Sequence, residues 1–253
     1  MSDEASAEVA SPYAQMHLAG WVPVHYDEVM YATDSYDTFI WGLERPFLRS
    51  VAGSLTLPAG DALRYLDFAC GTGRITCALE DLAIESLGVD ISPDMVSAAE
   101  AKSRHSSFSV GDILEHPGIA PGPYDLITAM RFFVNTEDEM RTRVMPALSA
   151  KLAGRHSRLV FNVHMNTINL LPAQLYRRLH GWPPYRSMTY WQAKRLVRDA
   201  GLDVVEVHGF GFLPSRLHRG PLAGISGWVD RRLSGRTPFN WLCRDLVFVC
   251  RPR

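Results

Sequence analysis

Short apolar runs alternate with stretches of helical spacing from residue 61 to the end of the chain. Runs of four to eight residues rich in β-branched and aromatic side chains are typical of strands, and their alternation with helices is typical of a parallel sheet. The predicted strands are Arg64–Phe68, Ser86–Asp90, Ser107–Gly111, Tyr124–Ala129, Ser157–Val163, Asp203–Phe210 and Asp245–Arg251. Helices are predicted over Arg74–Leu82 and over Pro93–Ser103, with Ser92 as the N-cap of the second. The pattern predicts a doubly wound, Rossmann-like α/β domain.

The first 60 residues have a different pattern. Residues 1–10 are small and acidic and are expected to be a disordered tail, whereas residues 13–55 have helical and aromatic character. A turn signal at residues 57–61 then precedes the first strand. We predict a tail and helical cap over residues 1–60 and one domain over residues 61–253, with a helical insert at about 166–200.

The composition removes several classes of function. The chain has 253 residues and a formal net charge of −1 at pH 7, so no whole-chain field attracts nucleic acid or anionic lipid. No apolar stretch approaches the roughly 18 residues of a membrane span, and the N-terminus lacks the apolar core of a signal peptide. We therefore expect a cytoplasmic protein, a monomer or homodimer, without nucleic-acid or membrane partners.

Cysteine and arginine usage adds little. The four cysteines form no CxxC pair, and no His, Cys, Asp and Glu set has metal-ligand spacing, so neither a zinc site nor another metal site is predicted. The arginines of residues 216–236 lack the interleaved aromatics of a nucleic-acid site, and we interpret this stretch, with His218, as a solvated helical face.

The most informative segment is the turn after the first predicted strand. Asp67 is followed by Phe68-Ala69-Cys70-Gly71-Thr72-Gly73 and then by a helix. Gly71 and Gly73 permit a positive φ and a close approach of backbone to ligand, while the helix offers unpaired N–H groups. By itself this loop is also compatible with a tight turn of purely structural role.

Two acids change that weighting. Asp90 ends the second predicted strand, where a nucleoside cofactor needs acceptors for its ribose hydroxyls. Asp112 ends the third, where it could accept from an adenine amino group. Acids at three successive strand ends indicate a nucleotide-like cofactor more strongly than any one of them.

With this loop, these acids and the fourth-strand segment Tyr124–Ala129, the chain resembles the class I S-adenosylmethionine-dependent methyltransferases over about residues 61–253. The resemblance implies a seven-stranded, mostly parallel sheet with an antiparallel last strand, and S-adenosyl-L-methionine as cofactor. It implies methyl transfer to a small-molecule acceptor through oxygen or nitrogen.

The resemblance also implies positions for the cofactor. Gly71 and Gly73 would lie against its methionine part and Asp90 would hold the ribose. The remaining cofactor-binding residues implied are Asp67, Ala69, Ile91, Asp112, Ile113 and Met130. Ile91 and Ile113 would sandwich the adenine, and Met130 or Arg131 would line the boundary between cofactor and substrate.

Two alternatives stay open at this level. A nicotinamide dehydrogenase also has a glycine loop and a ribose acid, but its fingerprint requires a third glycine or an alanine where this chain has Thr76. A protein of the same fold that binds the cofactor without transferring methyl, as a binding module or cyclase, is the other.

Candidates for the acceptor side come from the ends of the predicted sheet and from the cap. His164 follows the fifth strand and is the candidate general base, with His25 as a weaker one. Methyl transfer needs aligned reactants more than it needs a base, so His164 could also line a pocket without acid–base work. The expected substrate pocket comprises Tyr26, Tyr31, Arg131 and Tyr190.

Overall fold

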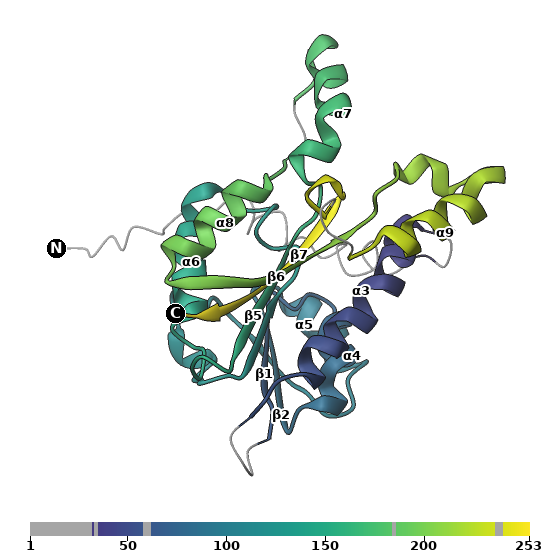
Figure 1. Ribbon diagram of the computed structural model, residues 1–253. Coiled ribbons are helices and arrows are strands. Elements are labelled where there is room, and N and C mark those ends of the chain that lie inside the picture. Colours follow the sequence, from purple (N-terminus) through teal and green to yellow (C-terminus); the bar gives the residue numbers. More distant parts are fainter. Residues whose placement is uncertain (1–31, 33–34, 58–61, 184–185, 236–239) are drawn as a thin grey trace.

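A computed structural model describes residue 32 and residues 35–57, 62–183, 186–235 and 240–253. Its centre is one seven-stranded sheet with the order β3-β2-β1-β4-β5-β7-β6 (Figure 1). The strands are β1 Arg64–Phe68, β2 Glu85–Asp90, β3 Ser107–Val110, β4 Leu126–Ala129, β5 Arg158–Val163, β6 Leu202–Phe210 and β7 Asp245–Pro252. The sequence prediction places all seven within two residues of these bounds.

The last strand runs against the others. β1 to β5 pair in parallel, whereas β7 is antiparallel to both of its neighbours, β5 and β6. The predicted mostly parallel sheet with an antiparallel last strand is therefore confirmed. Because six strands share one direction, their carboxyl ends meet at one edge of the sheet, where open α/β sheets bind their ligands.

Helices cover both faces of the sheet. α3 (Tyr36–Gly53), α4 (Arg74–Leu79) and α5 (Pro93–Glu100) lie on one face, and α6 (Asp138–Ser149) and α8 (Tyr190–Asp199) lie on the other (Figure 1). Short 3₁₀ turns follow α4 and connect other elements; they are Glu80–Leu82, Pro117–Ile119, Ser215–His218, Gly220–Leu222 and Asn240–Leu242.

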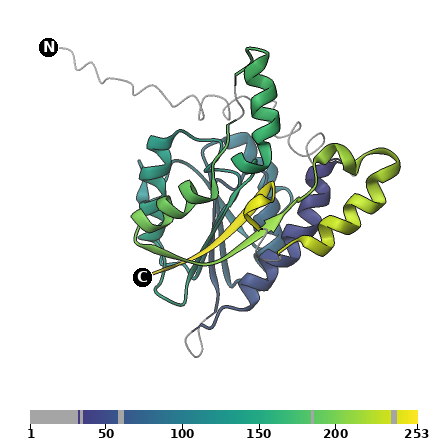
Figure 2. The same cartoon turned by 45° about the horizontal axis from the view of Figure 1, so that its top comes forward.

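Two further helices, α7 (Thr167–Leu179) and α9 (Ala223–Leu233), project from the body of the domain (Figure 2). α7 buries none of its residues, so this part of the predicted insert supplies no core. The predicted helix after Ser92 is confirmed, since the Ser92 hydroxyl accepts from the Met95 amide at the start of α5.

α3 belongs to the predicted N-terminal cap, and its packing explains its position. Its buried residues Tyr36, Ile40 and Leu48 are spaced four and eight positions apart, which makes one apolar stripe, with Glu44 between Ile40 and Leu48. This stripe packs on the same face of the sheet as Leu126 at the start of β4, Val160 in the middle of β5 and Met130 directly after β4. α3 therefore covers the sheet directly beside the carboxyl ends of its central strands.

Residues 216–236 were expected to form a solvated helical face, but His218 is buried. Its side chain is 6% exposed, and its ring lies against Tyr36 and Phe39. His218 Nε2 is 2.8 Å from an oxygen of Asp230, which is buried in α9 and also accepts from two backbone amides. The polar character of the sequence did not show that His218 and Asp230 form a buried pair, and this pair holds α9 against α3.

Candidate active site at the carboxyl edge of the sheet

The glycine loop leads from β1 into α4. Gly71 and Gly73 have φ values of 54° and 75°, and Gly73 is the N-cap of α4. A Cβ atom at Gly73 would lie 2.8 Å from the Ala99 Cβ, so only glycine fits there. A Cβ at Gly71 would meet nothing within 4 Å, which leaves open space beside the loop backbone.

Asp90 holds the loop in place from the end of β2. One carboxylate oxygen accepts from the Gly71 amide at 2.8 Å and the other from the Ser92 amide at 2.9 Å. A carboxylate has about four lone-pair sites, so these bonds are compatible with a ligand on the same group. Asp90 therefore joins the glycine loop to the start of α5 at the predicted ribose position.

Asp67 lies beneath the loop and is 1% exposed. Its two oxygens accept from the hydroxyls of Thr76 and Thr128, each at 2.6 Å. Burial raises the pKa of the Asp67 carboxyl to about 6, against the opposing effect of these bonds. In this arrangement Asp67 braces the loop; its expected contact with the cofactor stays a prediction.

Replacing Asp67 by alanine is expected to lower the free energy of unfolding by about 2–4 kcal/mol, because two buried hydroxyls would lose their charged acceptor. Urea denaturation followed by circular dichroism measures the change. Glu139→Ala, in the exposed first turn of α6, is the control and should change stability by less than about 0.5 kcal/mol. Equal stability of the Asp67 variant and the wild type would contradict the bracing role.

The residues expected around the adenine, which follow β2 and β3, differ in their burial. Asp112 closes a turn by accepting from the Leu114 amide at 2.8 Å. Ile113 is 1% exposed and packs in the core, whereas Ile91 is half-buried. Of the two side chains expected to sandwich an adenine, only Ile91 presents surface in this structure.

Strained backbone marks the ends of three central strands. Among the described residues, the non-glycine residues with positive φ are Ala69, Arg131 and Met165, at 53°, 61° and 59°. Each follows the end of β1, β4 or β5 by one or two residues. Such conformations cost free energy and persist where the surroundings impose them, often at functional sites.

Arg131 joins three elements at this edge. Its amide donates to the Asn162 side-chain oxygen in β5 at 2.5 Å, and its guanidinium donates to Asp37 in α3 at 3.1 Å. Its side chain is 10% exposed. Met130, which precedes it, is buried against α3 and β1. The residues predicted at the boundary between cofactor and substrate thus lie under α3.

His164 follows β5 and is buried, at 7% exposure. Its Nδ1 atom has no hydrogen-bond partner among the residues that the structure describes. Burial, together with the positive charges of Arg131 and Arg244, holds the pKa of the imidazole well below its ordinary value of 6.5. His164 is therefore neutral at physiological pH and has an unused ring nitrogen.

The region under α3 holds several buried polar atoms that have no hydrogen-bond partner within residues 35–57, 62–183, 186–235 and 240–253. These are both carboxyl oxygens of Glu44, the Asn162 Nδ2, the His164 Nδ1 and the Asp245 Oδ1. Buried polar groups in folded proteins are nearly always hydrogen-bonded, so such a concentration requires an explanation. A polar ligand that completes these bonds provides one.

Sequence reasoning missed Glu44, Asn162 and Asp245, although two of them carry a signal. Asn162 interrupts an otherwise apolar strand, and Glu44 interrupts the apolar stripe of α3 between Ile40 and Leu48. A polar residue in such a place is informative because its burial is costly.

Tyr190 lies away from this group. It packs on Phe248 of β7, with ring centroids 5.7 Å apart, and beside Lys194 of its own helix. Tyr26, Tyr31 and His25 lie outside the described residues. Within the described part of the chain, no cluster of three or more His, Cys, Asp and Glu side chains is placed to hold a metal ion.

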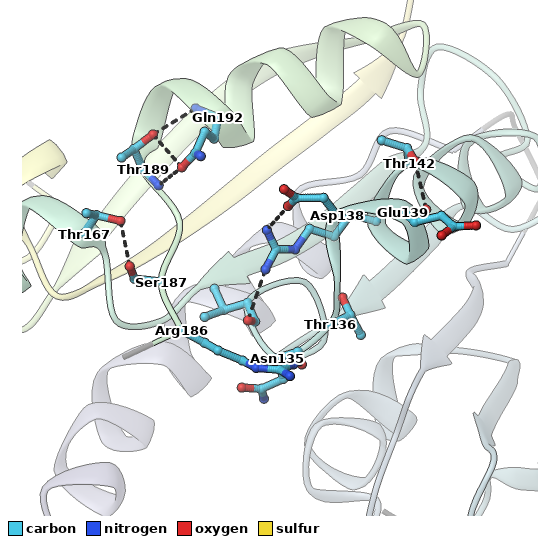
Figure 3. Close-up of polar contacts among 12 residues, drawn as sticks. Asn135, Thr136, Asp138, Glu139, Thr142, Thr167, Arg186, Ser187, Thr189 and Gln192 are labelled. Atoms are coloured by element: carbon cyan, nitrogen blue, oxygen red, sulfur yellow. Dashed lines mark hydrogen bonds and ion pairs between the residues drawn. The ribbon is translucent and has the colours of Figure 1, made fainter. Parts of the chain in front are cut away.

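The loop after β4 is tied to the connection between α7 and α8. The Arg186 guanidinium donates to the Asn135 carbonyl oxygen and lies 3.4 Å from Glu137. Figure 3 shows this contact beside the capping box of α8, in which Thr189 and Gln192 bond reciprocally. The segment that leaves the projecting α7 is thereby anchored next to the site.

The sheet with its antiparallel last strand, the glycine loop after β1 and the acid after β2 define the class I S-adenosylmethionine-dependent methyltransferases, and the chain belongs to this class. Residues 66–153 match a family model described as a methyltransferase domain. The cofactor is S-adenosyl-L-methionine. No helix in the described parts of the chain is long and apolar enough to cross a membrane.

Relatives and solved structures agree with this class. The ubiquinone biosynthesis O-methyltransferase of Methylococcus capsulatus is 27% identical over 160 residues, which is 60% of this chain and 68% of the relative. The ubiquinone biosynthesis O-methyltransferase of Xanthomonas campestris pv. campestris is 26% identical over 209 residues, which is 76% of this chain and 78% of the relative.

Two solved structures share the fold. The magnesium protoporphyrin IX methyltransferase of Synechocystis PCC 6803, with bound SAH, has a TM-score of 0.62 and 15% identity, covering 95% of this chain and all of that one. The N-methyltransferase NodS of Bradyrhizobium japonicum, in complex with S-adenosyl-L-homocysteine, has a TM-score of 0.57 and 15% identity, covering 94% of this chain and 96% of that one.

The described residues fit this cofactor. Open space lies beside Gly71, a carboxylate follows β2 where ribose hydroxyls need acceptors, and unpartnered polar atoms lie under α3. S-adenosylmethionine has hydroxyls, an amino group, an ammonium and a carboxylate, and this set of donors and acceptors is complementary to them.

Proposed function

We propose that this methyltransferase transfers the methyl group to a hydroxyl of a small acceptor seated under α3 beside the ends of β4 and β5. The neutral His164 with its unpartnered Nδ1, beside the positive charges of Arg131 and Arg244, carries the proposal. The matched relatives are named O-methyltransferases, which supports oxygen as the acceptor atom.

The cofactor side of the site follows the predicted roles. Ala69, Gly71 and Gly73 would hold the methionine part and Asp90 the ribose, and Met130 would lie beside the reacting groups. The adenine would lie among Ile91, Asp112 and Ile113. Bound S-adenosylmethionine supplies a methyl group that its sulfonium already activates.

The acceptor side needs a group that takes a proton. The His164 Nδ1 would accept a hydrogen bond from the acceptor hydroxyl and take its proton as the oxygen attacks the methyl. The guanidiniums of Arg131 and Arg244 would stabilise negative charge on that oxygen in a site with little water. Arg131 has a further bond to Asp37, so α3 would fix the position of this charge.

The test is methyl transfer to a panel of small phenols, catechols and amines, with formation of S-adenosylhomocysteine and of the methylated product both measured. We expect products from hydroxyl acceptors. Products from amines alone would overturn the choice of oxygen. Tight binding of the cofactor without any methyl loss would favour the binding-protein alternative.

The expected cytoplasmic location, the monomer or homodimer, and the absence of nucleic-acid and membrane partners stay predictions, as do the proposed domain bounds and the pocket role of Tyr190.

A further inference from the structure

Glu44 occupies an unusual position for an acid. It lies in the middle of the apolar stripe of α3, one helical turn from Ile40 and one from Leu48, and it is 1% exposed. Neither of its carboxyl oxygens has a hydrogen-bond partner in the described part of the chain. Burying a carboxyl without partners costs several kcal/mol, and a leucine here would be less costly.

The fold satisfies another buried acid completely. Glu80, 7% exposed, accepts from the hydroxyls of Ser103 and Ser106 and from the amides of Arg104 and His105. This network holds the pKa of Glu80 below its ordinary value, although burial acts in the opposite direction. Among the described residues Glu44 has no comparable network, so both of its carboxyl oxygens can accept from a ligand.

The charges around Glu44 locate its carboxyl. Arg131 and Arg74 lower its pKa, while Asp245 and Asp37 raise it, and burial outweighs them all, so that the pKa is about 7. Arg74 is the first residue of α4, directly after the glycine loop, and Arg131 follows β4. β1 and β4 are neighbours in the sheet, so these charges place Glu44 near the carboxyl ends of both strands.

Arg74 is itself held against α3. Its guanidinium carbon lies 4.2 Å from the centre of the Trp41 ring, one turn before Glu44. Two cationic side chains therefore flank the buried acid at the place where the glycine loop meets α3. Arg131 is already paired with Asp37, and Asp245 adds a second negative charge near Glu44, so the two arginines do not compensate an ionised Glu44. A ligand group with hydrogen-bond donors and positive charge would supply that compensation.

We propose that Glu44 binds the α-ammonium group of the methionine part of S-adenosylmethionine. This inference rests on the cofactor of the proposed function and adds a residue that precedes the matched methyltransferase domain. An ammonium has three donors, enough for both unpartnered oxygens, and its charge compensates the buried carboxylate. The neighbouring cofactor carboxylate would lie toward Arg74 and Arg131.

The test compares two ligands that differ in the amino-acid part. S-adenosylhomocysteine carries the ammonium and the carboxylate, and 5′-methylthioadenosine carries the same adenosine and thioether without them. In calorimetric titrations, Glu44→Gln is expected to weaken the binding of S-adenosylhomocysteine at least tenfold, which is about 1.4 kcal/mol. The dissociation constant of 5′-methylthioadenosine should stay within about twofold of its wild-type value.

Glu80→Gln is the matched control, since it changes a buried acid of the same length outside the site. It is expected to lower thermal stability and to leave both affinities unchanged.

Glu44→Gln should fold well. The raised pKa of Glu44 means that wild-type stability is lost as pH rises through about 7, and glutamine removes that loss. Equal weakening of both ligands, or of neither, would overturn the proposal.

A second measurement uses the unaltered protein. At pH 7 binding of S-adenosylhomocysteine should release a fraction of a proton, because the ammonium favours the ionised Glu44, and 5′-methylthioadenosine should release less. Titrations in two buffers of different ionisation enthalpy measure this difference, and equal release by both ligands would contradict the proposal. Failure of the wild-type protein to bind any of these ligands would instead contradict its proposed function.

Discussion

Asp90→Ala is expected to weaken binding of S-adenosylmethionine and S-adenosylhomocysteine by more than tenfold. The substitution removes the proposed acceptor of the ribose hydroxyls. It also removes the acceptor of the Gly71 amide, which holds the glycine loop, and of the Ser92 amide at the start of α5. The loss therefore combines a direct contact with the geometry of the loop.

Calorimetric titration with both ligands and with NAD measures this effect. Asp94→Ala, an exposed acid in the first turn of the same helix, is the control and should leave all affinities unchanged. An Asp90 variant with wild-type affinity would remove Asp90 from the site. Binding of NAD alone to the wild type would contradict the class of cofactor.

His164→Gln should reduce turnover by at least about 100-fold, the usual contribution of a positioned general base. Affinity for S-adenosylmethionine should change by less than about twofold, because the imidazole is placed on the acceptor side. His116→Gln, at an exposed position, serves as the control. A His164 variant with wild-type turnover would mean that the histidine only lines the pocket.

The pH dependence of turnover tests the electrostatics of the same residue. A base acts in its neutral form, so turnover should rise with pH through the pKa of His164 and then become constant. Since burial and two arginines hold that pKa well below 6.5, the plateau should extend from pH 6.5 to 8. A His164-dependent fall in turnover centred near pH 7 would contradict this assignment.

The strands and the cofactor edge were predictable because their signals are local. Apolar runs between turns gave the bounds of the strands, and the glycines and the acids after β1, β2 and β3 stand within a few residues of strand ends. Asp67 has the same local signal as Asp90, but the structure buries it between two threonines. Only the packing of β4 on β1 distinguishes these two acids.

The acceptor edge was predictable in part. The position of His164 after β5 follows from the strand pattern, but its charged neighbours are Arg131, after β4, and Arg244, directly before β7, and both are far away along the chain. The aromatics of the predicted insert show less about their role, because Tyr176, Trp182 and Trp191 are each more than half exposed. They lie in α7, after α7 and in α8, and an aromatic-rich sequence alone does not say which of these side chains a partner covers.

The division of the site between segments bears on how its specificity can change. The glycine loop and the acids after β2 and β3 come from the region that matches the methyltransferase domain, whereas Asp37 and Glu44 come from α3, which precedes it. α3 is attached to the domain by side-chain packing and by few long-range polar contacts, such as Arg49 with Asp81 at 2.6 Å. Substitutions in this one helix therefore change the region under α3, whereas the residues at the nucleoside end of the cofactor stay unaltered. Chimaeras that exchange only this helix between related enzymes offer a route to altered acceptor choice.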